Sequence, residues 1–431
     1  MPDKKENGLG GVPNAFLYHF IGLGIVVSLS RLVFGFKIRR NIEVVRMKGP
    51  LVCVGNHPSF LDPIIMAALL FGRKINYVAG SFLFRNRFLG PLFTGGGAIP
   101  KTQFRSDSKA VKGMLTALKR GGTLGIFPEA TRLVDGHSIH FDDALARMIK
   151  KTDSAIAVMV THGAYMTWPR WSKSGFRRGR ITAEIISVLT AERVQEMSVE
   201  EIQEYLLEQL QYSEYEWFAE HPLAFKNKAI ASGAQNVAHA CPRCEKDNVM
   251  SADKDMLICS SCGNRVRMEP TGFFRPEGEG DKAFPDMHQW VNWEKDRMRA
   301  RVMKEDFCIN EKVRLFLPLD EYVFREVGSG ELTIKDGRAE YSGTQCPVEL
   351  GVEYKKGRPK KCKYGDEQRV YEPVVKVFPV ERLRGLKLNY GKSIELIEAG
   401  GQINRFIPEN PQRIFEMQTA IEAMQELLSQ G

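Results

Sequence analysis

The sequence has no uncharged apolar run long enough to cross a bilayer without interruption. Residues 15–30 carry no charge, but Arg31 follows at once, and a spanning helix needs about 20 apolar residues. No small-residue cleavage site follows this run, which argues against a cleaved signal peptide. Internal repeats and low-complexity tracts are also absent. With 43% apolar and 26% charged residues, the composition is that of a folded, largely soluble protein.

Cysteine is sparse, and acidic residues are outnumbered. Four of the eight cysteines form two Cys-x-x-Cys pairs and the other four are scattered, which favours a reducing compartment over a secreted disulfide framework. The net charge of +9 favours an anionic partner, either a membrane surface or nucleic acid. A chain of 431 residues is expected to form two or three domains.

The segment from Leu51 to Asp62 has the pattern of a strand followed by a turn and a helix. Residues 51–54 predict a short buried strand, and Gly55-Asn56 supply the turn that ends it. His57 therefore lies at the exposed end of a strand, and Asp62 follows after one turn of chain. A carboxylate beside an imidazole holds its tautomer and supports the imidazolium that forms on protonation. The pair suits a general base that acts on an alcohol.

A second polar cluster, Glu129-Ala130-Thr131-Arg132, follows another strand-like run at residues 123–127. Polar clusters at the ends of two strands can meet along one edge of a sheet. The two segments, Asn56-His57-Pro58-Ser59-Phe60-Leu61-Asp62 and Phe127-Pro128-Glu129-Ala130-Thr131-Arg132, resemble the first and third motifs of the lysophosphatidic-acid (1-acylglycerol-3-phosphate) acyltransferase family. The resemblance covers roughly the first half of the chain.

This resemblance implies an O-acyltransferase of phospholipid synthesis or remodelling. Such an enzyme moves a fatty acyl group from acyl-CoA or acyl-carrier protein to the free hydroxyl of lysophosphatidic acid or a related lysolipid. By analogy, His57 is the base and Asp62 orients it. The residues implied in substrate binding are Glu129, Thr131 and Arg132, with Lys101 or Arg105 in the role of the basic residue of the family's second motif.

The chain departs from the family pattern in places. Ala130 stands where the family has Gly, and the strand at residues 155–160 leads to Thr161 and His162 rather than to a Pro. His162 is interpreted as a packed or capping residue. An ion pair between Glu129 and Arg132 is an alternative to a role in binding. The departures also support an alternative function, a non-catalytic membrane or nucleic-acid-binding adaptor built on a degenerate acyltransferase domain.

Strand-like runs alternate with helical ones between residues 41 and 226. The expected strands are at residues 51–54, 75–78, 124–127, 155–160 and 181–186. This alternation predicts an α/β acyltransferase domain with a mostly parallel sheet flanked by helices. An amphipathic helix at residues 198–212 closes it, and the polar stretch 227–239 predicts a linker.

Residues 1–40 predict a membrane-associated helical segment. The apolar residues run all round the helix and end in the basic stretch 37–40, which suits a helix or bent pair set in one leaflet against anionic headgroups. A core helix is the alternative. The segment predicts a peripheral or monotopic protein on the cytoplasmic face of the cell membrane.

Two Cys-x-x-Cys pairs follow, at Cys241, Cys244, Cys259 and Cys262. Their spacing is typical of a zinc ribbon, placed at residues 238–270, and four thiolates suit a closed structural Zn²⁺ site with no part in catalysis. The loop between the pairs has balanced charge, which argues against nucleic acid as a partner.

Residues 307–431 predict a small antiparallel β-barrel-like domain with a C-terminal helix, similar to a pleckstrin-homology domain. Short runs at residues 322–325 and 331–334 are read as two separate strands, and Asp336-Gly337 as a hairpin turn. Apolar residues at helical spacing place the closing helix at residues 411–428.

Overall fold

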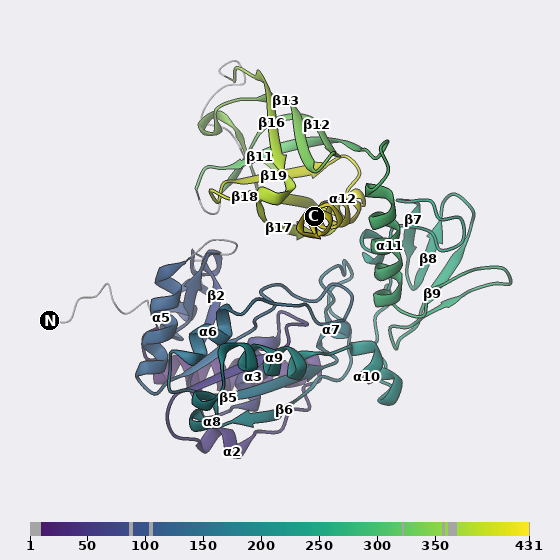
Figure 1. The fold of residues 1–431 in the computed structure, drawn as a ribbon. Coiled ribbons are helices and arrows are strands. Elements are labelled where there is room, and N and C mark those ends of the chain that lie inside the picture. Colours follow the sequence, from purple (N-terminus) through teal and green to yellow (C-terminus); the bar gives the residue numbers. More distant parts are fainter. Residues whose placement is uncertain are drawn as a thin grey trace. The chain divides into compact units, whose positions relative to one another are not determined.

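The chain folds as two compact units (Figure 1). The computed structural model describes residues 10–85, 89–102, 107–320, 323–355, 358–360 and 369–430. The first unit consists of residues 1–230 together with 269–273, and the second of residues 231–268 together with 274–431.

The first unit is built on a six-stranded sheet in the order β3-β2-β4-β1-β5-β6. Its strands are β1 (Leu51–Gly55), β2 (Ile75–Gly80), β3 (Ile99–Lys101), β4 (Thr123–Ile126), β5 (Ala155–His162) and β6 (Thr182–Leu189). All neighbours pair in parallel except β5 and β6, which are antiparallel. The predicted mostly parallel sheet is confirmed. The sequence did not predict β3, which has three residues.

Helices cover both faces of this sheet, and β1 shows how the sequence specifies it. Its side chains alternate between two apolar clusters because successive residues of a strand point to opposite faces. Leu51 and Cys53 pack with helix α3 and the N-terminal helices, whereas Val52 and Val54 pack with helices α5, α6 and α9. The helices of this unit are α2 (Ile42–Arg46), α3 (Asp62–Leu69), η3 (Ser81–Arg85), α4 (Leu89–Gly95), α5 (Ser108–Lys119), α6 (Ala144–Lys150), α7 (Ala164–Thr167), α8 (Ala191–Glu196), α9 (Val199–Leu210) and α10 (Glu214–Glu220).

Local sequence explains where the helices begin. Helix α9, close to its predicted bounds, starts with a capping box in which Ser198 and Glu201 each bind the other's backbone N–H. Helix α3 begins at Asp62, with a proline in its first turn, where the missing N–H leaves no bond unmade. Asp62 is thereby fixed at the helix start that follows His57.

The N-terminal segment is a π-helix, η2 (Leu17–Val27), continued by α1 (Ser28–Phe34). Residues 17–34 are long and apolar enough to cross a membrane by length and composition, with a mean hydropathy of 1.7. Tyr18 and Val27 are buried against the sheet cluster, while Phe16 and Leu32 are 63% and 84% exposed. One side of the segment therefore belongs to the core, and apolar side chains remain on the surface.

The second unit contains two sheets and two long helices. One is a four-stranded sheet, β10-β9-β8-β7, in which Cys259 is the last residue of β8, while the other three cysteines of the pairs lie in the loops before β7 and after β8. The other sheet joins nine strands, antiparallel throughout, and helix α12 follows the last of them, as predicted. The elements are η4 (Ala234–Asn236), β7 (Met250–Asp253), β8 (Met256–Cys259), β9 (Arg265–Met268), β10 (Phe274–Pro276), α11 (Met287–Val302), β11 (Ile309–Pro318), β12 (Phe324–Lys335), β13 (Arg338–Gln345), η5 (Val348–Leu350), β14 (Val352–Lys355), β15 (Arg358–Pro359), β16 (Glu372–Pro379), η7 (Val380–Arg382), β17 (Leu383–Asn389), β18 (Ser393–Glu398), β19 (Ile403–Pro408) and α12 (Arg413–Gln430).

Strand β12 corrects the prediction of two separate strands. It runs unbroken from Phe324 to Lys335 through Gly328 and Gly330. A Cβ at either glycine would collide with the backbone of β13, so these glycines permit close approach of two strands rather than a break. The hairpin turn at Asp336-Gly337 is confirmed, with φ of 48° and 69°.

The boundary between the two units falls after Ile230, inside the linker predicted at residues 227–239, but this stretch is packed rather than exposed. Ala231, Ala234, Val237 and Ala238 are buried, and the stretch includes the short helix η4. Small apolar side chains spaced through a polar stretch are enough to pack it, which composition alone did not reveal.

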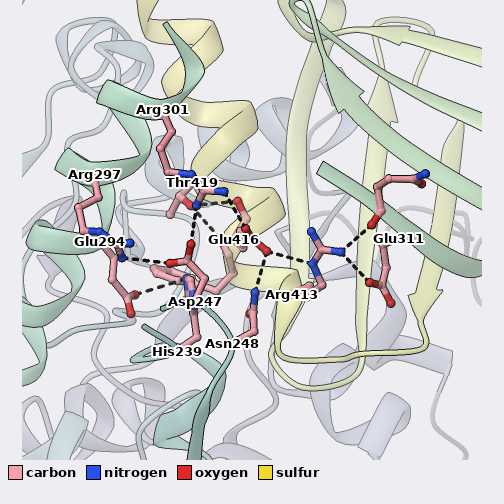
Figure 2. A network of polar contacts seen from close by, with 12 residues as sticks. His239, Asp247, Asn248, Glu294, Arg297, Arg301, Glu311, Arg413, Glu416 and Thr419 are labelled. Carbon is pink, nitrogen blue, oxygen red and sulfur yellow. Dashed lines mark hydrogen bonds and ion pairs between the residues drawn. The ribbon is translucent and has the colours of Figure 1, made fainter. Parts of the chain in front are cut away.

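A network of charged side chains connects the cysteine-bearing sheet to both long helices of the second unit (Figure 2). Asp247, in the loop after the first cysteine pair, accepts hydrogen bonds from Arg297 at 3.0 Å and Arg301 at 2.8 Å, both on α11. The next residue, Asn248, donates to Glu416 on α12 at 2.8 Å. The loop is thereby held by two helices at once.

Candidate active site

His57 and Asp62 form a hydrogen-bonded pair at the end of β1. His57 Nδ1 lies 2.7 Å from Asp62 Oδ2, which also accepts the backbone N–H of Ser59 at 2.9 Å. The bond to Asp62 places the proton on Nδ1 and leaves Nε2 as the ring nitrogen that can accept another. Burial raises the pKa of the fully buried Asp62 carboxyl, and the hydrogen bond to His57 opposes this rise. The imidazole itself is 20% exposed.

Two further contacts fix the imidazole. Asn56 makes a pair of hydrogen bonds with the backbone of Thr161 on β5, at 3.1 and 2.9 Å, which anchors the turn that carries His57. The ring of Phe127 stacks on the imidazole, with centroids 4.9 Å apart and an interplanar angle of 18°. His57 is therefore held both by the end of β1 and by Phe127 of the third motif.

The third motif, residues 127–132, meets the first directly. The backbone N–H of Leu133 donates to the carbonyl of His57 at 3.1 Å. Glu129 is 5% exposed, and neither carboxyl oxygen has a hydrogen-bond partner. Burial raises the pKa of Glu129 well above its usual value, the charge of Asp62 adds to the effect, and the nearby backbone N–H of His57 acts weakly in the opposite direction. An ion pair between Glu129 and Arg132 stays an alternative to a role in binding.

Ala130 has left-handed backbone geometry, with φ of 57°. Its side chain is exposed, so the methyl group does not narrow the site. A side chain in this conformation is strained, whereas glycine is not. The conformation explains why the family pattern has Gly at this position.

Thr131 and Arg132 extend the site along the surface. The guanidinium of Arg132 lies 3.4 Å from the ring centroid of Phe60, which belongs to the first motif. Thr131 Oγ1 accepts a hydrogen bond from Arg170 Nη1 at 2.6 Å. Sequence reasoning missed Arg170, because it lies 39 positions from Thr131 and no local pattern marks it.

The two basic candidates of the second motif are not brought to this cluster by any contact that the structure describes. Lys101 is exposed at the end of the edge strand β3. Arg105 lies outside the described residues. Their roles remain predictions.

His162 is packed, in line with its interpretation from sequence. It is 7% exposed, its Nδ1 lies 3.1 Å from the hydroxyl of Tyr212, and burial lowers its pKa. Tyr212 donates in turn to Glu214 at 2.7 Å, and burial raises the pKa of Glu214 to about 7. The charge of Asp62 adds to this rise, so the buried chain lies within electrostatic reach of the His57–Asp62 pair.

The four cysteines of the second unit fit a metal ion. Their Sγ atoms all lie within 4.8 Å of one another. In a tetrahedral zinc site with sulfur at about 2.3 Å, the sulfurs are roughly 3.8 Å apart. The Sγ–Sγ separations, 3.6 Å for Cys241–Cys262 and 3.8 Å for Cys244–Cys259, match that geometry. With all four corners of a tetrahedron filled by protein, such a site has no open position for substrate.

Comparison with known proteins bears on the first unit. The acyltransferase family model matches residues 37–162, a range that contains both motifs. Residues 37–162 are therefore similar to the acyltransferase family. The chain is 28% identical over 134 residues to the chloroplastic 1-acyl-sn-glycerol-3-phosphate acyltransferase LPAT1 of Arabidopsis thaliana, and 28% identical over 116 residues to the 1-acyl-sn-glycerol-3-phosphate acyltransferase of Bacillus subtilis. The predicted relation is confirmed for this domain.

The matches cover part of each protein. They span 31% and 27% of this chain, and 37% and 57% of the Arabidopsis and Bacillus proteins. Among solved structures, the 1-acyl-sn-glycerophosphate acyltransferase PlsC of Thermotoga maritima aligns with a TM-score of 0.40 and 18% identity, over 52% of this chain and 84% of that chain.

Proposed function

We propose that the protein is an O-acyltransferase that moves a fatty acyl group from acyl-CoA or acyl-carrier protein to the hydroxyl of lysophosphatidic acid or a related lysolipid. The observation that carries the proposal is the His57–Asp62 pair, 2.7 Å apart, beside the buried and unpartnered carboxyl of Glu129. Burying a carboxyl without a partner costs roughly 1–3 kcal/mol, so its retention favours a ligand that completes it. The two relatives named above carry the same activity in their names.

In the proposed reaction His57 Nε2 takes the proton of the acceptor hydroxyl. The oxygen attacks the thioester carbonyl, the new C–O ester bond forms, the C–S bond breaks, and the leaving thiolate takes the proton from His57 to become the free thiol. Asp62 supports the imidazolium through Nδ1. Glu129, Thr131 and Arg132 bind the polar part of the acceptor. Lys101 or Arg105 is a further phosphate ligand.

The decisive experiment is an acceptor panel with labelled donors. Lysophosphatidic acid, other lysophospholipids and monoacylglycerol are each offered with acyl-CoA and with acyl-carrier protein. We expect His57→Ala to lower turnover by roughly a hundredfold to ten-thousandfold while the fold survives. His140→Ala, which removes an exposed histidine of the same unit, is the matched control. Near-normal turnover by His57→Ala would contradict the mechanism.

The same panel tests the adaptor alternative. If no acceptor is acylated with either donor, while nucleic acid binds with a steep dependence on salt, the protein is an adaptor and not an enzyme.

We propose that the N-terminal segment seats the first unit on a membrane, on the cytoplasmic face, without spanning it. Exposed apolar side chains, among them Phe16 and Leu32, support this orientation because water is a poor surrounding for them. We expect Leu32→Glu to reduce sedimentation with vesicles of anionic phospholipid. Val188→Glu, at an exposed apolar position on β6, is the control. Equal sedimentation of both variants would contradict the proposal.

We propose that the four cysteines hold one structural Zn²⁺. The fit of the sulfur separations supports zinc. The ion would cross-link the two cysteine pairs and take no part in the reaction. The likeness of the following β domain to pleckstrin-homology domains stays a prediction.

A further inference from the structure

Arg170 lies beside the third motif although it is distant from it in sequence. It follows the short helix α7, and its Nη1 donates to Thr131 Oγ1 at 2.6 Å. Arg170 is half-buried. An arginine side chain that is already held by a partner has lost part of its conformational freedom before any ligand arrives. Its charge is thus placed in advance at the motif.

The chain around Thr131 connects this position to the reacting group. Thr131 lies two residues before Leu133, whose N–H binds the carbonyl of His57 at 3.1 Å. Two residues before Thr131 is Glu129, whose buried carboxyl has no partner and indicates that a polar ligand belongs here. A cation fixed on Thr131 therefore lies next to the space where the acceptor's polar group is expected.

The other basic candidates are placed differently. Lys101 ends β3, and the order β3-β2-β4-β1 puts three strand spacings, about 14 Å, between it and β1. The guanidinium of Arg132 packs over Phe60. Arg170 differs from both in being held on the hydroxyl of the motif's own threonine. Guanidinium groups match phosphate oxygens well, because their N–H groups form a rigid planar fork.

We propose that Arg170 is a specificity-determining residue that binds the phosphate of a phosphate-bearing lysolipid acceptor. The inference rests on the proposed acyl transfer for its substrate, and it predicts a preference for acceptors with a phosphate monoester over neutral ones. In this role Arg170 acts on acceptor binding and leaves the proton transfer at His57 unchanged.

The test compares Arg170→Gln, Arg170→Lys and the wild type in the full chain. With lysophosphatidic acid as acceptor, Arg170→Gln should raise KM about tenfold or more with little change in kcat, because a hydrogen bond to a charged group is lost. With monoacylglycerol, the same variant should act like the wild type. Arg170→Lys should recover part of the lost affinity. Arg178→Gln, at an exposed arginine of the same unit, should change neither KM.

A calorimetric titration with short-chain lysophosphatidic acid, without donor, separates this proposal from the proposed reaction. Loss of about tenfold in affinity in Arg170→Gln, with unchanged melting temperature, supports the assignment whether or not turnover is seen. Equal loss for both acceptors, an unchanged affinity, or a fall in melting temperature that Arg170→Lys does not restore would overturn it. Absence of turnover in the wild type with every acceptor counts against the proposed function instead.

Discussion

Two buried glutamates, one in each unit, have opposite surroundings. Glu129 in the first unit is 5% exposed and unpartnered, and burial raises its pKa well above the usual value. Glu416 in the second is 2% exposed, but it accepts hydrogen bonds from Asn248 at 2.8 Å, Arg413 at 3.0 Å and Arg301 at 3.3 Å. Burial also acts to raise the pKa of Glu416, yet the charge of Arg413 and these hydrogen bonds outweigh it, so the pKa is lowered.

The presence or absence of charged partners distinguishes a carboxylate that stabilises the fold from a carboxyl that we propose binds a ligand. Glu416 joins α12 to the loop after the first cysteine pair and, through Arg301, to α11 (Figure 2). Neither carboxyl oxygen of Glu129 has a side-chain partner, and Glu129 lies in the motif that contacts His57. A buried carboxylate is stable in the second unit because it is paired, whereas burial of the Glu129 carboxyl favours its neutral form; we propose that a bound acceptor supplies its missing partner.

The largest effect is expected where the network of the second unit meets the cysteines. The double variant Cys259→Ser, Cys262→Ser removes two of the four proposed zinc ligands, and structural zinc contributes on the order of 10 kcal/mol to folding. We expect zinc content to fall from one ion per chain to none. Hydrogen exchange in α11 and α12 should then accelerate, because Asp247 and Asn248 are no longer positioned.

Cys308→Ser, which removes an exposed cysteine of the same unit, is the control and should keep the ion. Unchanged protection of α11 and α12 in a variant that has lost its zinc would show that the network stands without the metal.

A smaller effect is expected from Glu416→Gln. Removing one partner of a buried charged cluster leaves the other charges uncompensated, so the second unit should lose about 3 kcal/mol of unfolding free energy at pH 7. The lowered pKa means that the stabilisation is present above about pH 4.5 and is lost as the pH falls through the native pKa. The difference between variant and wild type should therefore shrink in acid.

Glu426→Gln on the same helix is the matched control for this change. Glu426 pairs with Arg299, but both side chains are about half exposed, so the substitution should cost less than about 1 kcal/mol. Hydrogen exchange of peptides from α12 measures both variants. Equal losses would mean that burial of Glu416 does not decide the outcome.

Replacing Glu129 by Gln should change the free energy of unfolding in the opposite direction, because it stabilises the folded chain. Between the usual carboxyl pKa and the raised native pKa, the folded chain binds more protons than the unfolded chain, so stability falls as the pH rises. Glu129→Gln removes this dependence and should stabilise the first unit by about 1–2 kcal/mol at pH 8, with a smaller gain at pH 5. Acyl transfer should fall at the same time.

Thermal unfolding at the two pH values, monitored through exchange of β1 and β5, provides the measurement for Glu129→Gln. Glu204→Gln, at an exposed position on α9, is the control. Destabilisation by Glu129→Gln at both pH values would show that the carboxyl has a structural role after all.

Sequence reasoning succeeded where a local pattern coincides with a structural requirement. The strands β1, β4 and β5 are central strands buried on both faces, so most of their residues are apolar and none is Asp, Glu, Lys or Arg. His57 and Asp62 were paired correctly because a strand end and a helix start fix them within six residues. The cysteine spacing gave the ribbon for a similar reason.

The failures share a different cause, since they depend on neighbours distant in sequence. Gly328 and Gly330 resemble a strand break until β13 is seen to press against them. The small residues of the stretch 227–239 resemble a linker until their burial is known. Arg170 has no motif of its own and is recognised only by its contact with Thr131.

Ala130 combines both cases, and it gives the smallest predicted effect. The sequence marks it as a departure from Gly, and the structure adds the reason, a φ of 57° at an exposed position. Relief of the left-handed strain by Ala130→Gly should stabilise the first unit by about 1 kcal/mol, with little change in turnover because the methyl group lies outside the site. Thermal unfolding and the acyl-transfer assay measure the two effects.

Ala191→Gly, in the first turn of α8, is the matched control and should destabilise by up to about 1 kcal/mol, since a helix disfavours glycine. A loss of stability at both positions would mean that the backbone at residue 130 is not strained, and that the alanine was selected for another property of the motif.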